Sequence, residues 1–498
     1  MIVVAIEIED KFDVPVDYEI PDLTGVRGAA EVVGPRSHQL VAIYFDTADL
    51  RLAARGITLR RRRGGADAGW HLKLPKAKGV RQEITHPLTK SAKIVPPDLA
   101  QLVLAFTRGA ALAPIAELDT RRSVTLLRGP DGRTLLEVAD DRVKGTVFGA
   151  EPHVERWREV EAELIAADDD ALLRKVGKRL RKAGAVPADS ASKLSRLLNG
   201  AAPAPVPAPA PTSPGSAGEV VVGYLRTQVN ALLAQDPRVR RAEEDAVHQM
   251  RVASRRLRSA LKAFKSVVPD TRPLQDELKW LGNELGEVRD LEVIRARFGK
   301  LLGGLPDELV VGPVAHRLGS DLEAKESQAY DRVRVSLGGE RYFGLLNSLE
   351  ALVAAPPLTE RAGRPAAKTL TAVAAKQWHR VTGAYDTAQA IEDQDERDIA
   401  MHEVRKAAKR ARYTAEALGM TELARRAEDV QETLGVHQDG VIAQELLERE
   451  AETARRAGED AFTYGVLVGL ERAAADRAYA RFPKVWKKTT AAVHGILG

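Results

Sequence analysis

Several short segments near the start of the chain place charged residues two positions apart between apolar ones. In "IEIEDKF", Glu7, Glu9 and Lys11 stand two positions apart, and the positions of the other parity include Ile6, Ile8 and Phe12. Side chains two apart share one face of a β-strand, so these three groups would point the same way. Carboxylates suit a hard cation such as Mg²⁺ or Mn²⁺, and Arg and Lys suit phosphate oxygens. Together they suit metal-assisted chemistry on phosphate groups.

Later segments repeat this spacing and sort their charges by sign. In chain order they carry Arg60 and Arg62 in "TLRRRR", Lys73 in "HLKLP", Glu137 and Asp141 in "EVADD", and Glu159 and Glu161 in "REVEAEL". If the strands close with these faces inward, the buried charges require a compensating guest. An ordinary sheet with one solvated face is the alternative.

The elements that must position these residues follow from the same patterns. Many short period-two runs before residue 200 predict an antiparallel sheet or barrel, and "DDDALLRKVGKRLRKAG" predicts a helix. The Ala- and Pro-rich stretch 200–218 predicts an extended linker. Helical periodicity fills residues 219–498, so we expect an α+β protein of two domains.

Composition narrows the class of protein. The 498 residues include no cysteine, which excludes disulfides and thiolate chemistry. The formal net charge of +5 says little about partners. The first residues lack the features of a signal peptide, and no apolar run approaches the roughly 20 residues of a membrane span. We therefore expect a cytoplasmic protein without membrane contact.

The ordered set of N-terminal motifs resembles the CYTH family, the triphosphate tunnel metalloenzymes. "EIEDK" matches the ExExK motif, and "YFDTADLRLAARGITLRRR", "HLKLP", "RQE", "TRRS", "EVADD", "EVEAEL" and "SKLSR" follow in order. The resemblance implies an eight-stranded antiparallel tunnel with flanking helices, which hydrolyses triphosphate-type substrates with a divalent metal.

The resemblance also implies roles for individual residues. The metal would be held by Glu7, Glu9, Asp141, Glu159 and Glu161. The phosphates would be held by Arg60, Arg62, Lys73, Arg122 and Lys193. Catalysis would depend on Glu7, Glu9, Lys11 and Glu83. Two of these correspondences stay open. Either Arg121 or Arg122 could match the arginine of the family motif, and Glu161 and Glu163 could replace Glu159 and Glu161 as the acidic pair.

Two helical stretches in the C-terminal half repeat one pattern. "HQMRVASRRLR" starts at His248 and "HEVRKAAKRAR" at His402, and the bases at 251, 255 and 258 correspond to those at 405, 409 and 412. Steps of three and four residues trace one helical face. Each basic stretch is followed by one of two similar segments, "LGEVRDLEV" and "LGVHQDGVI", which are called the LG…D echoes below. We therefore infer an internal duplication.

The repeated basic faces predict a polyanion partner. The alternative is a pair of surface helices paired with neighbouring acids, although exposed ion pairs contribute only ~0–1 kcal/mol. Neighbouring positive charge disfavours a metal at the histidines. The absence of interleaved aromatic side chains disfavours nucleic acid and leaves a simple phosphate chain.

These stretches resemble the CHAD family, conserved-histidine α-helical domains associated with inorganic polyphosphate. By that resemblance the anion groove is lined by His248, Arg251, Arg255, Arg256, Arg258, Lys262, His402, Arg405, Lys409, Arg410 and Arg412. Asp290 and Asp439 follow the two LG turns and would orient basic side chains. Such binding would allow association with polyphosphate granules.

The sequence therefore predicts a tunnel domain at 1–199, a linker at 200–218 and a helical domain at 219–498. The expected function is metal-dependent hydrolysis of inorganic triphosphate or polyphosphate, with polyphosphate held by the helical domain. The alternatives are a non-catalytic polyphosphate-binding protein, an organic triphosphatase and an adenylate cyclase. A base-carrying substrate would need a stacking aromatic, for which Trp70 and Trp157 are the candidates unless they serve only in packing.

Overall fold

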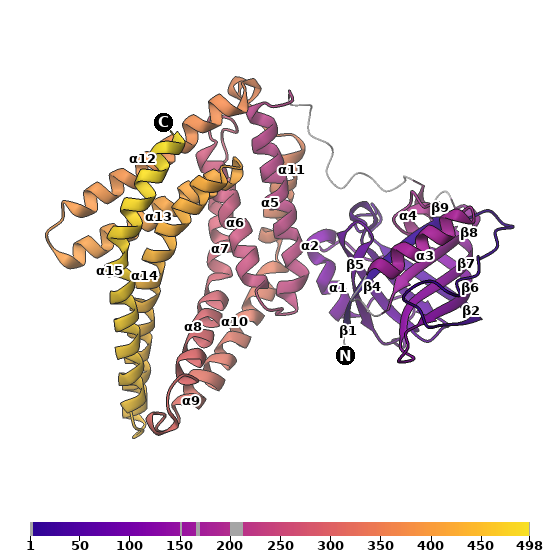
Figure 1. The fold of residues 1–498 in the computed structure, drawn as a ribbon, viewed down its shortest axis with the longest axis horizontal. Helices are drawn as coiled ribbons and strands as arrows, with labels where there is room; N and C mark the ends of the chain where they lie inside the picture. Colours follow the sequence, from indigo (N-terminus) through magenta and orange to yellow (C-terminus); the bar gives the residue numbers. More distant parts are fainter. Residues whose placement is uncertain (1–2, 150–151, 166–169, 200–212, 498) are drawn as a thin grey trace. The chain divides into compact units, whose positions relative to one another are not determined.

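The chain forms two compact units, residues 1–205 and 206–498. The computed structural model describes residues 3–149, 152–165, 170–199 and 213–497. Figure 1 shows strands in the first unit and helices in the second. No helix in the described parts is long and apolar enough to cross a membrane.

The first unit is a closed antiparallel barrel, which confirms the predicted fold class. Its strands are β1 (Val3–Asp13), β2 (Glu31–Asp46), β3 (Thr58–Arg63), β4 (Gly69–Ala77), β5 (Val80–His86), β6 (Ala113–Arg128), β7 (Thr134–Val147), β8 (Val154–Leu164) and the short β9 (Val186–Pro187). The order β5-β4-β3-β2-β6-β7-β8-β1 closes on itself because β1 also pairs with β5. The register Lys11↔Glu161 and Lys73↔Glu83 brings the charged segments side by side.

Helices pack on the barrel at two places. The apolar face of α3 (Asp170–Lys182) covers outward residues of β1, β7 and β8, including Phe12, Val138 and Val160. The helix α4 (Lys193–Leu198) instead packs Leu194 and Leu197 against residues such as Ala42 and Leu118, which also line the barrel interior. The shorter helices α1 (Pro97–Ala100) and α2 (Leu104–Thr107) lie between β5 and β6 in the chain.

The second unit is all helical, as predicted. Its helices are α5 (Ala217–Arg240), α6 (Ala246–Ala263), α7 (Arg272–Glu284), α8 (Gly286–Leu302), α9 (Val314–His316), α10 (Leu322–Leu337), α11 (Glu340–Ala354), α12 (Ala366–Gln389), α13 (Gln394–Ala417), α14 (Thr421–Arg456) and α15 (Phe462–Leu497). The basic stretches form α6 and α13, and the echoes lie in α8 and α14. The LG pairs are not turns: Leu285 joins α7 to α8 in helical conformation, and Leu434 and Gly435 lie inside α14.

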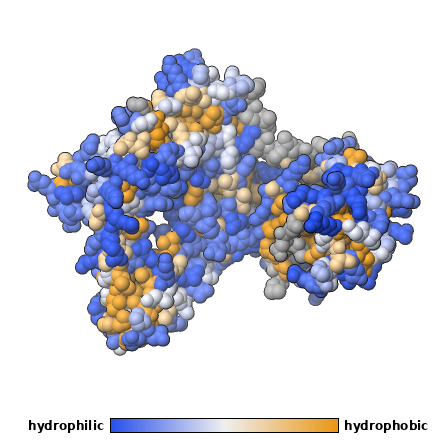
Figure 2. All heavy atoms as spheres, viewed as in Figure 1, coloured by the Kyte–Doolittle hydropathy of each residue, from blue (hydrophilic) through white to orange (hydrophobic). Residues whose placement is uncertain are grey.

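Apolar clusters hold this unit together. One joins α12, α13, α14 and α15 through residues such as Trp378, Val404, Val430 and Phe482. A second joins α8 and α9 to α14 and α15. Figure 2 shows largely hydrophilic residues over the helical unit, with apolar areas among them. Phe462, the first residue of α15, is exposed.

Candidate functional site

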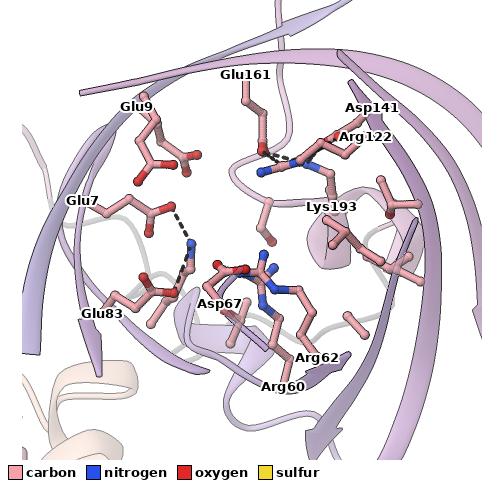
Figure 3. A pocket seen from close by; sticks show the side chains of 18 of the residues that line it. Glu7, Glu9, Arg60, Arg62, Asp67, Glu83, Arg122, Asp141, Glu161 and Lys193 are labelled. Carbon is pink, nitrogen blue, oxygen red and sulfur yellow. Dashed lines mark hydrogen bonds and ion pairs between the residues drawn. The ribbon is translucent and has the colours of Figure 1, made fainter. Parts of the chain in front are cut away.

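The interior of the barrel gathers the charged residues of the N-terminal segments. Because side chains alternate along a strand, every second residue of β1, β3, β4 and β8 points inward. These side chains surround a cavity of about 200 Å³ (Figure 3). Its lining contains every predicted tunnel residue except Glu159: Glu7, Glu9, Lys11, Arg60, Arg62, Lys73, Glu83, Arg122, Asp141, Glu161 and Lys193.

One wall of the cavity is acidic, with ammonium groups between the carboxylates. Lys73 Nζ contacts Glu7 Oε1 and lies 3.5 Å from Glu83 Oε1, while Lys11 Nζ lies 2.7 Å from Glu9 Oε2. Burial would raise the pKa of Glu9, but Lys11 and Lys73 outweigh it and hold that pKa below its ordinary value. Glu7 Oε2 is buried without a hydrogen-bond partner. The wall therefore keeps negative charge that the lysines do not fully satisfy.

A second group of opposite charges lies across the cavity (Figure 3). Arg122 donates to both oxygens of Asp141, at 2.9 and 2.7 Å, and to Glu161 at 2.6 Å. Lys193, the first residue of α4, lies 3.0 Å from Asp141 Oδ2 and 2.6 Å from Glu161 Oε1. Asp141 is fully buried, and despite that burial the two cations hold its pKa below the ordinary value. These carboxylates are thus charged and already paired.

Two guanidinium groups on β3 have donors to spare. Arg60 Nη1 donates to Tyr44 Oη at 3.3 Å, and Arg62 forms an ion pair with Asp67. The Nε groups of both arginines are buried without hydrogen-bond partners. Burial and the neighbouring charges of Arg60 and Arg122 lower the pKa of Arg62 to about 9. An anion with several acceptor oxygens would satisfy these donors.

In the helical unit, α6 and α13 pack against each other and bring equivalent arginines to equivalent places. Arg251 Nη1 donates to Gly286 O at 2.8 Å and lies 3.5 Å from Asp290 Oδ1. Arg405 lies 3.9 Å from Asp439, and a Cβ added to Gly435 would lie 3.3 Å from its Nε. Each LG…D echo therefore accommodates one arginine of a basic helix, as the inferred duplication suggests.

Arg251 and Arg405 lie close enough to Arg255 and Lys409 for the four positive charges to affect one another. Burial, followed by the charges of Arg255, Arg405 and Arg251, lowers the pKa of Lys409 to about 7. Burial, followed by the charges of Arg251 and Arg405, lowers the pKa of Arg255, whose Nε is buried without a hydrogen-bond partner. This group, Arg251, Arg255, Arg405 and Lys409, is called the basic cluster below. It would gain stability from a bound anion.

Comparisons with known proteins agree with this architecture. The CYTH domain model matches residues 5–198, and the CHAD domain model matches residues 223–448. The uncharacterized protein MT2285 of Mycobacterium tuberculosis (strain CDC 1551 / Oshkosh) is 38% identical over 98% of this chain and 97% of its own length. The chain belongs to the CYTH and CHAD families.

Two of the solved structures similar to the chain each cover a little more than half of it. The CHAD domain from the plant Ricinus communis is 25% identical, covers 57% of this chain and 96% of its own, and gives a TM-score of 0.45. PptA from Streptomyces chartreusis is 23% identical, covers 55% and 99% respectively, and gives a TM-score of 0.45.

The CHAD domain divides the predicted groove residues into paired and unpaired groups. Arg256 and Arg412 both pair with Glu416, each at 2.8 Å, and Arg412 also pairs with Glu428 at 2.7 Å. Arg258 and Lys262 are exposed, whereas Arg410 is half-buried. Arg380 of α12, which the sequence did not single out, contributes to lowering the pKa of both Lys262 and Arg410.

The two CHAD histidines lie beside the basic cluster. Burial, followed by the charge of Arg289, lowers the pKa of His248. Burial, followed by Lys406 and Arg405, lowers the pKa of His402. Both imidazoles are therefore neutral near pH 7, and each can offer one N–H group to an anion.

The CYTH cavity also contains residues to which the sequence assigned no role. Arg81, Tyr44 and Asp67 line it, together with Glu137 and the alternative acidic residue Glu163. Burial, followed by the charges of Glu7 and Glu9, raises the pKa of Glu163 to about 8. The alternation in "EVEAEL" gives 159, 161 and 163 one parity, and only the closed barrel separates them. Likewise Arg122 lines the cavity, whereas Arg121 is exposed.

The carboxylates of the CYTH cavity suit a divalent cation chemically. Glu7 Oε2 has no hydrogen-bond partner, and the like charges around Glu163 favour a cation between them. Among the described residues, no three His, Asp or Glu side chains form a ready metal-binding group. Lysine and arginine face the carboxylates instead, so a cation would have to displace some of these contacts.

Proposed function

We propose that the CYTH domain hydrolyses inorganic triphosphate, or terminal units of polyphosphate, with Mg²⁺ or Mn²⁺. The observation that carries this proposal is the cavity inside the barrel, in which unpartnered donors of Arg60 and Arg62 accompany an unpartnered oxygen of Glu7. A metal-bound phosphate chain supplies both the cation and the anion that such a cavity lacks.

The residues divide between the two tasks. Arg60, Arg62, Lys73, Arg122 and Lys193 would hold phosphate oxygens and orient the chain. Glu7, Glu9 and Glu163 would hold the cation. Asp141, Glu159 and Glu161 pair with Arg122 or Lys193 and would act through those contacts. The bound cation would neutralise phosphate charge and polarise a phosphorus–oxygen bond. Lys11 keeps Glu9 ionised, and Glu83 contacts the ammonium of Lys73.

An inorganic substrate fits this CYTH domain better than a nucleotide or thiamine triphosphate. Trp70 is fully buried against Phe45, and Trp157 is 8% exposed and lies under Arg196. Among the described residues that line the cavity, Tyr44 is the one aromatic, and it accepts a hydrogen bond from Arg60. No stacking platform for a base is thus offered at the cavity.

We further propose that the CHAD domain binds polyphosphate along the basic cluster. Arg251, Arg255, Arg405 and Lys409 would make the central contacts, with His248 and His402 as additional donors. Arg258, Lys262 and Arg410 would extend the path. Arg256 and Arg412, already neutralised by Glu416, would serve mainly to join α6 to α13.

Phosphate release from triphosphate, long-chain polyphosphate, ATP and thiamine triphosphate tests the proposal, with Mg²⁺, with Mn²⁺ and with a chelator. We expect metal-dependent release from the inorganic substrates. Binding of polyphosphate without release from any substrate would favour the non-catalytic alternative. Preferential turnover of ATP or thiamine triphosphate would favour an organic triphosphatase, and formation of cyclic AMP a cyclase.

A further inference from the structure

A buried histidine lies behind the acidic wall of the CYTH cavity. His71 is on β4 two residues before Lys73, so its ring points inward, yet its side chain is only 2% exposed and does not line the cavity. Its Nδ1 lies 3.0 Å from Glu83 Oε1, and its Nε2 lies 3.0 Å from the backbone oxygen of Asp67. Both ring nitrogens therefore face acceptors.

The two acceptors compete for one proton. Burial, together with Arg60 and Arg62, lowers the pKa of His71 to about 4, so the ring is neutral near pH 7. A neutral imidazole carries a single N–H group. Donation to a carboxylate is stronger than donation to a neutral carbonyl, and a lone pair pointed at a carboxylate is repelled. The Nδ1–H tautomer is thus favoured.

The carboxylate that His71 contacts belongs to a chain of charged groups. Glu83 lies 3.5 Å from Lys73 Nζ, which also contacts Glu7 (Figure 3). Hydrogen bonding by His71, with the charges of Lys73 and Arg60, holds the pKa of Glu83 far below its ordinary value despite burial. If Glu83 were free to rotate, it could form a closer ion pair with Lys73 and draw that ammonium away from a phosphate.

We propose that His71 is a positioning residue, which donates from Nδ1 to Glu83 and thereby fixes Lys73 for phosphate binding. This inference rests on the proposed function of the cavity for its effect on phosphate. The hydrogen bond itself is independent of that function.

Two substitutions separate the ring nitrogens. His71→Asn places an amide N–H near the position of Nδ1, and His71→Gln places one near that of Nε2. Loss of a hydrogen bond to a charged group corresponds to about a tenfold change or more. We expect His71→Gln to weaken binding of inorganic triphosphate about tenfold in a chelator, measured calorimetrically, and to raise the KM equally with metal. His71→Asn should stay within about threefold of the wild type.

Controls distinguish positioning from packing. His86→Leu, on neighbouring β5, should leave triphosphate binding unchanged, and thermal denaturation should show all variants folded. In a Glu83→Gln background the difference between the Asn and Gln variants should disappear. The proposal would be overturned if both His71 variants lost triphosphate binding equally or both retained it equally. It would also be overturned if the two variants still differed in the Glu83→Gln background.

A spectroscopic measurement needs neither metal nor substrate. In protein labelled with ¹⁵N-histidine, the His71 signals are identified as those missing from the spectrum of His71→Gln. We expect their chemical shifts to show a protonated Nδ1, and we expect Glu83→Gln to change the shift of that nitrogen. A protonated Nε2 would overturn the proposal. If Nδ1 is protonated but the protein hydrolyses no triphosphate, the hydrogen bond from His71 to Glu83 is supported and the proposed function of the cavity is wrong.

Discussion

At the scale of single residues, the CYTH cavity holds cations and anions that neutralise one another only in part. Lys11, Lys73 and Lys193 each contact more than one carboxylate, but Glu7 Oε2 and the Nε groups of Arg60 and Arg62 have no hydrogen-bond partner. Buried polar atoms without partners are rare in folded proteins and cost free energy. Their coincidence in one cavity is the strongest local evidence for an ionic ligand.

The carboxylate of Glu7 provides a direct test of the catalytic proposal. We expect Glu7→Gln to lower triphosphate turnover by about a hundredfold or more, because a neutral amide binds a divalent cation less well. Phosphate release at saturating Mg²⁺ measures the effect. Retention on immobilised polyphosphate should not change, since the basic cluster lies in the other domain. Glu117→Gln is the matched control, because Glu117 lies on the face of β6 that points away from the cavity. Loss of polyphosphate retention in Glu7→Gln would contradict the division of tasks between the two domains.

The second prediction concerns Lys409 and the pH dependence of polyphosphate binding. Its pKa is lowered to about 7 in the folded protein by burial and by Arg255, Arg405, Arg251 and Arg412. A phosphate chain would restore the charged form, so binding takes up a proton between about pH 7 and the ordinary lysine value. Affinity should therefore rise as pH falls from 8.5 to 7, by up to tenfold per unit.

Calorimetry in buffers of different ionisation enthalpy would count the protons taken up by Lys409. Lys409→Arg should bind without this uptake, because arginine stays charged. Lys406→Arg, an exposed lysine paired with Glu403, should behave like the wild type. Uptake that is equal in the Lys409→Arg protein would assign the proton to another group.

At the scale of elements, strand alternation explains why so much of the CYTH site could be predicted. Charged residues two apart in β1 and β3 had to share a face, and burial of that face required a closed barrel. Alternation could not predict how far along the barrel axis each side chain lies. Glu159, Glu161 and Glu163 have one parity, but only Glu161 and Glu163 line the cavity. His71 shares the parity of Lys73, and "WHLKL" contained that signal.

Helical periodicity was less informative about the predicted anion-binding residues of the CHAD domain. Steps of three and four correctly placed Arg251 and Arg255 with the cluster, and Arg405 and Lys409 likewise. They could not show that Arg256 meets Glu416, because that contact joins residues 160 positions apart. The LG pairs predict turns, and glycine is common where a helix ends. Here Gly435 lies within α14 and gives space to an arginine instead.

That space makes a prediction about helix packing. A side chain at Gly435 would meet Arg405 Nε and Nη2 at 3.3 Å, so Gly435→Val must displace the guanidinium. We expect weaker polyphosphate binding without loss of helical content. Gly469→Val in α15, where an added Cβ meets nothing within 4 Å, carries the same change in helix propensity as a control. Binding by titration and circular dichroism would separate the two effects; equal affinities would remove Gly435 from the site.

At the scale of the whole molecule, the chain joins two units that each gather charged side chains in one place. In one, strands surround a cavity of about 200 Å³, which suits a short phosphate segment. In the other, duplicated helices align cations along a face, which suits a long chain. The Ala- and Pro-rich stretch 200–218 joins them in sequence. Tethering raises the effective concentration of a substrate held by one domain for the other.

Cleavage of the connection tests whether the domains cooperate. A protease site inserted in residues 201–212 would leave the intact protein unchanged and allow the units to be separated after purification. We expect the KM for long-chain polyphosphate to rise by about tenfold or more on cleavage, because capture then no longer delivers substrate to the cavity. The KM for triphosphate, which is too short to occupy both sites, should not change. An equal KM for the long chain before and after cleavage would show that the two domains act independently, whereas a parallel rise for triphosphate would point to damage of the CYTH domain.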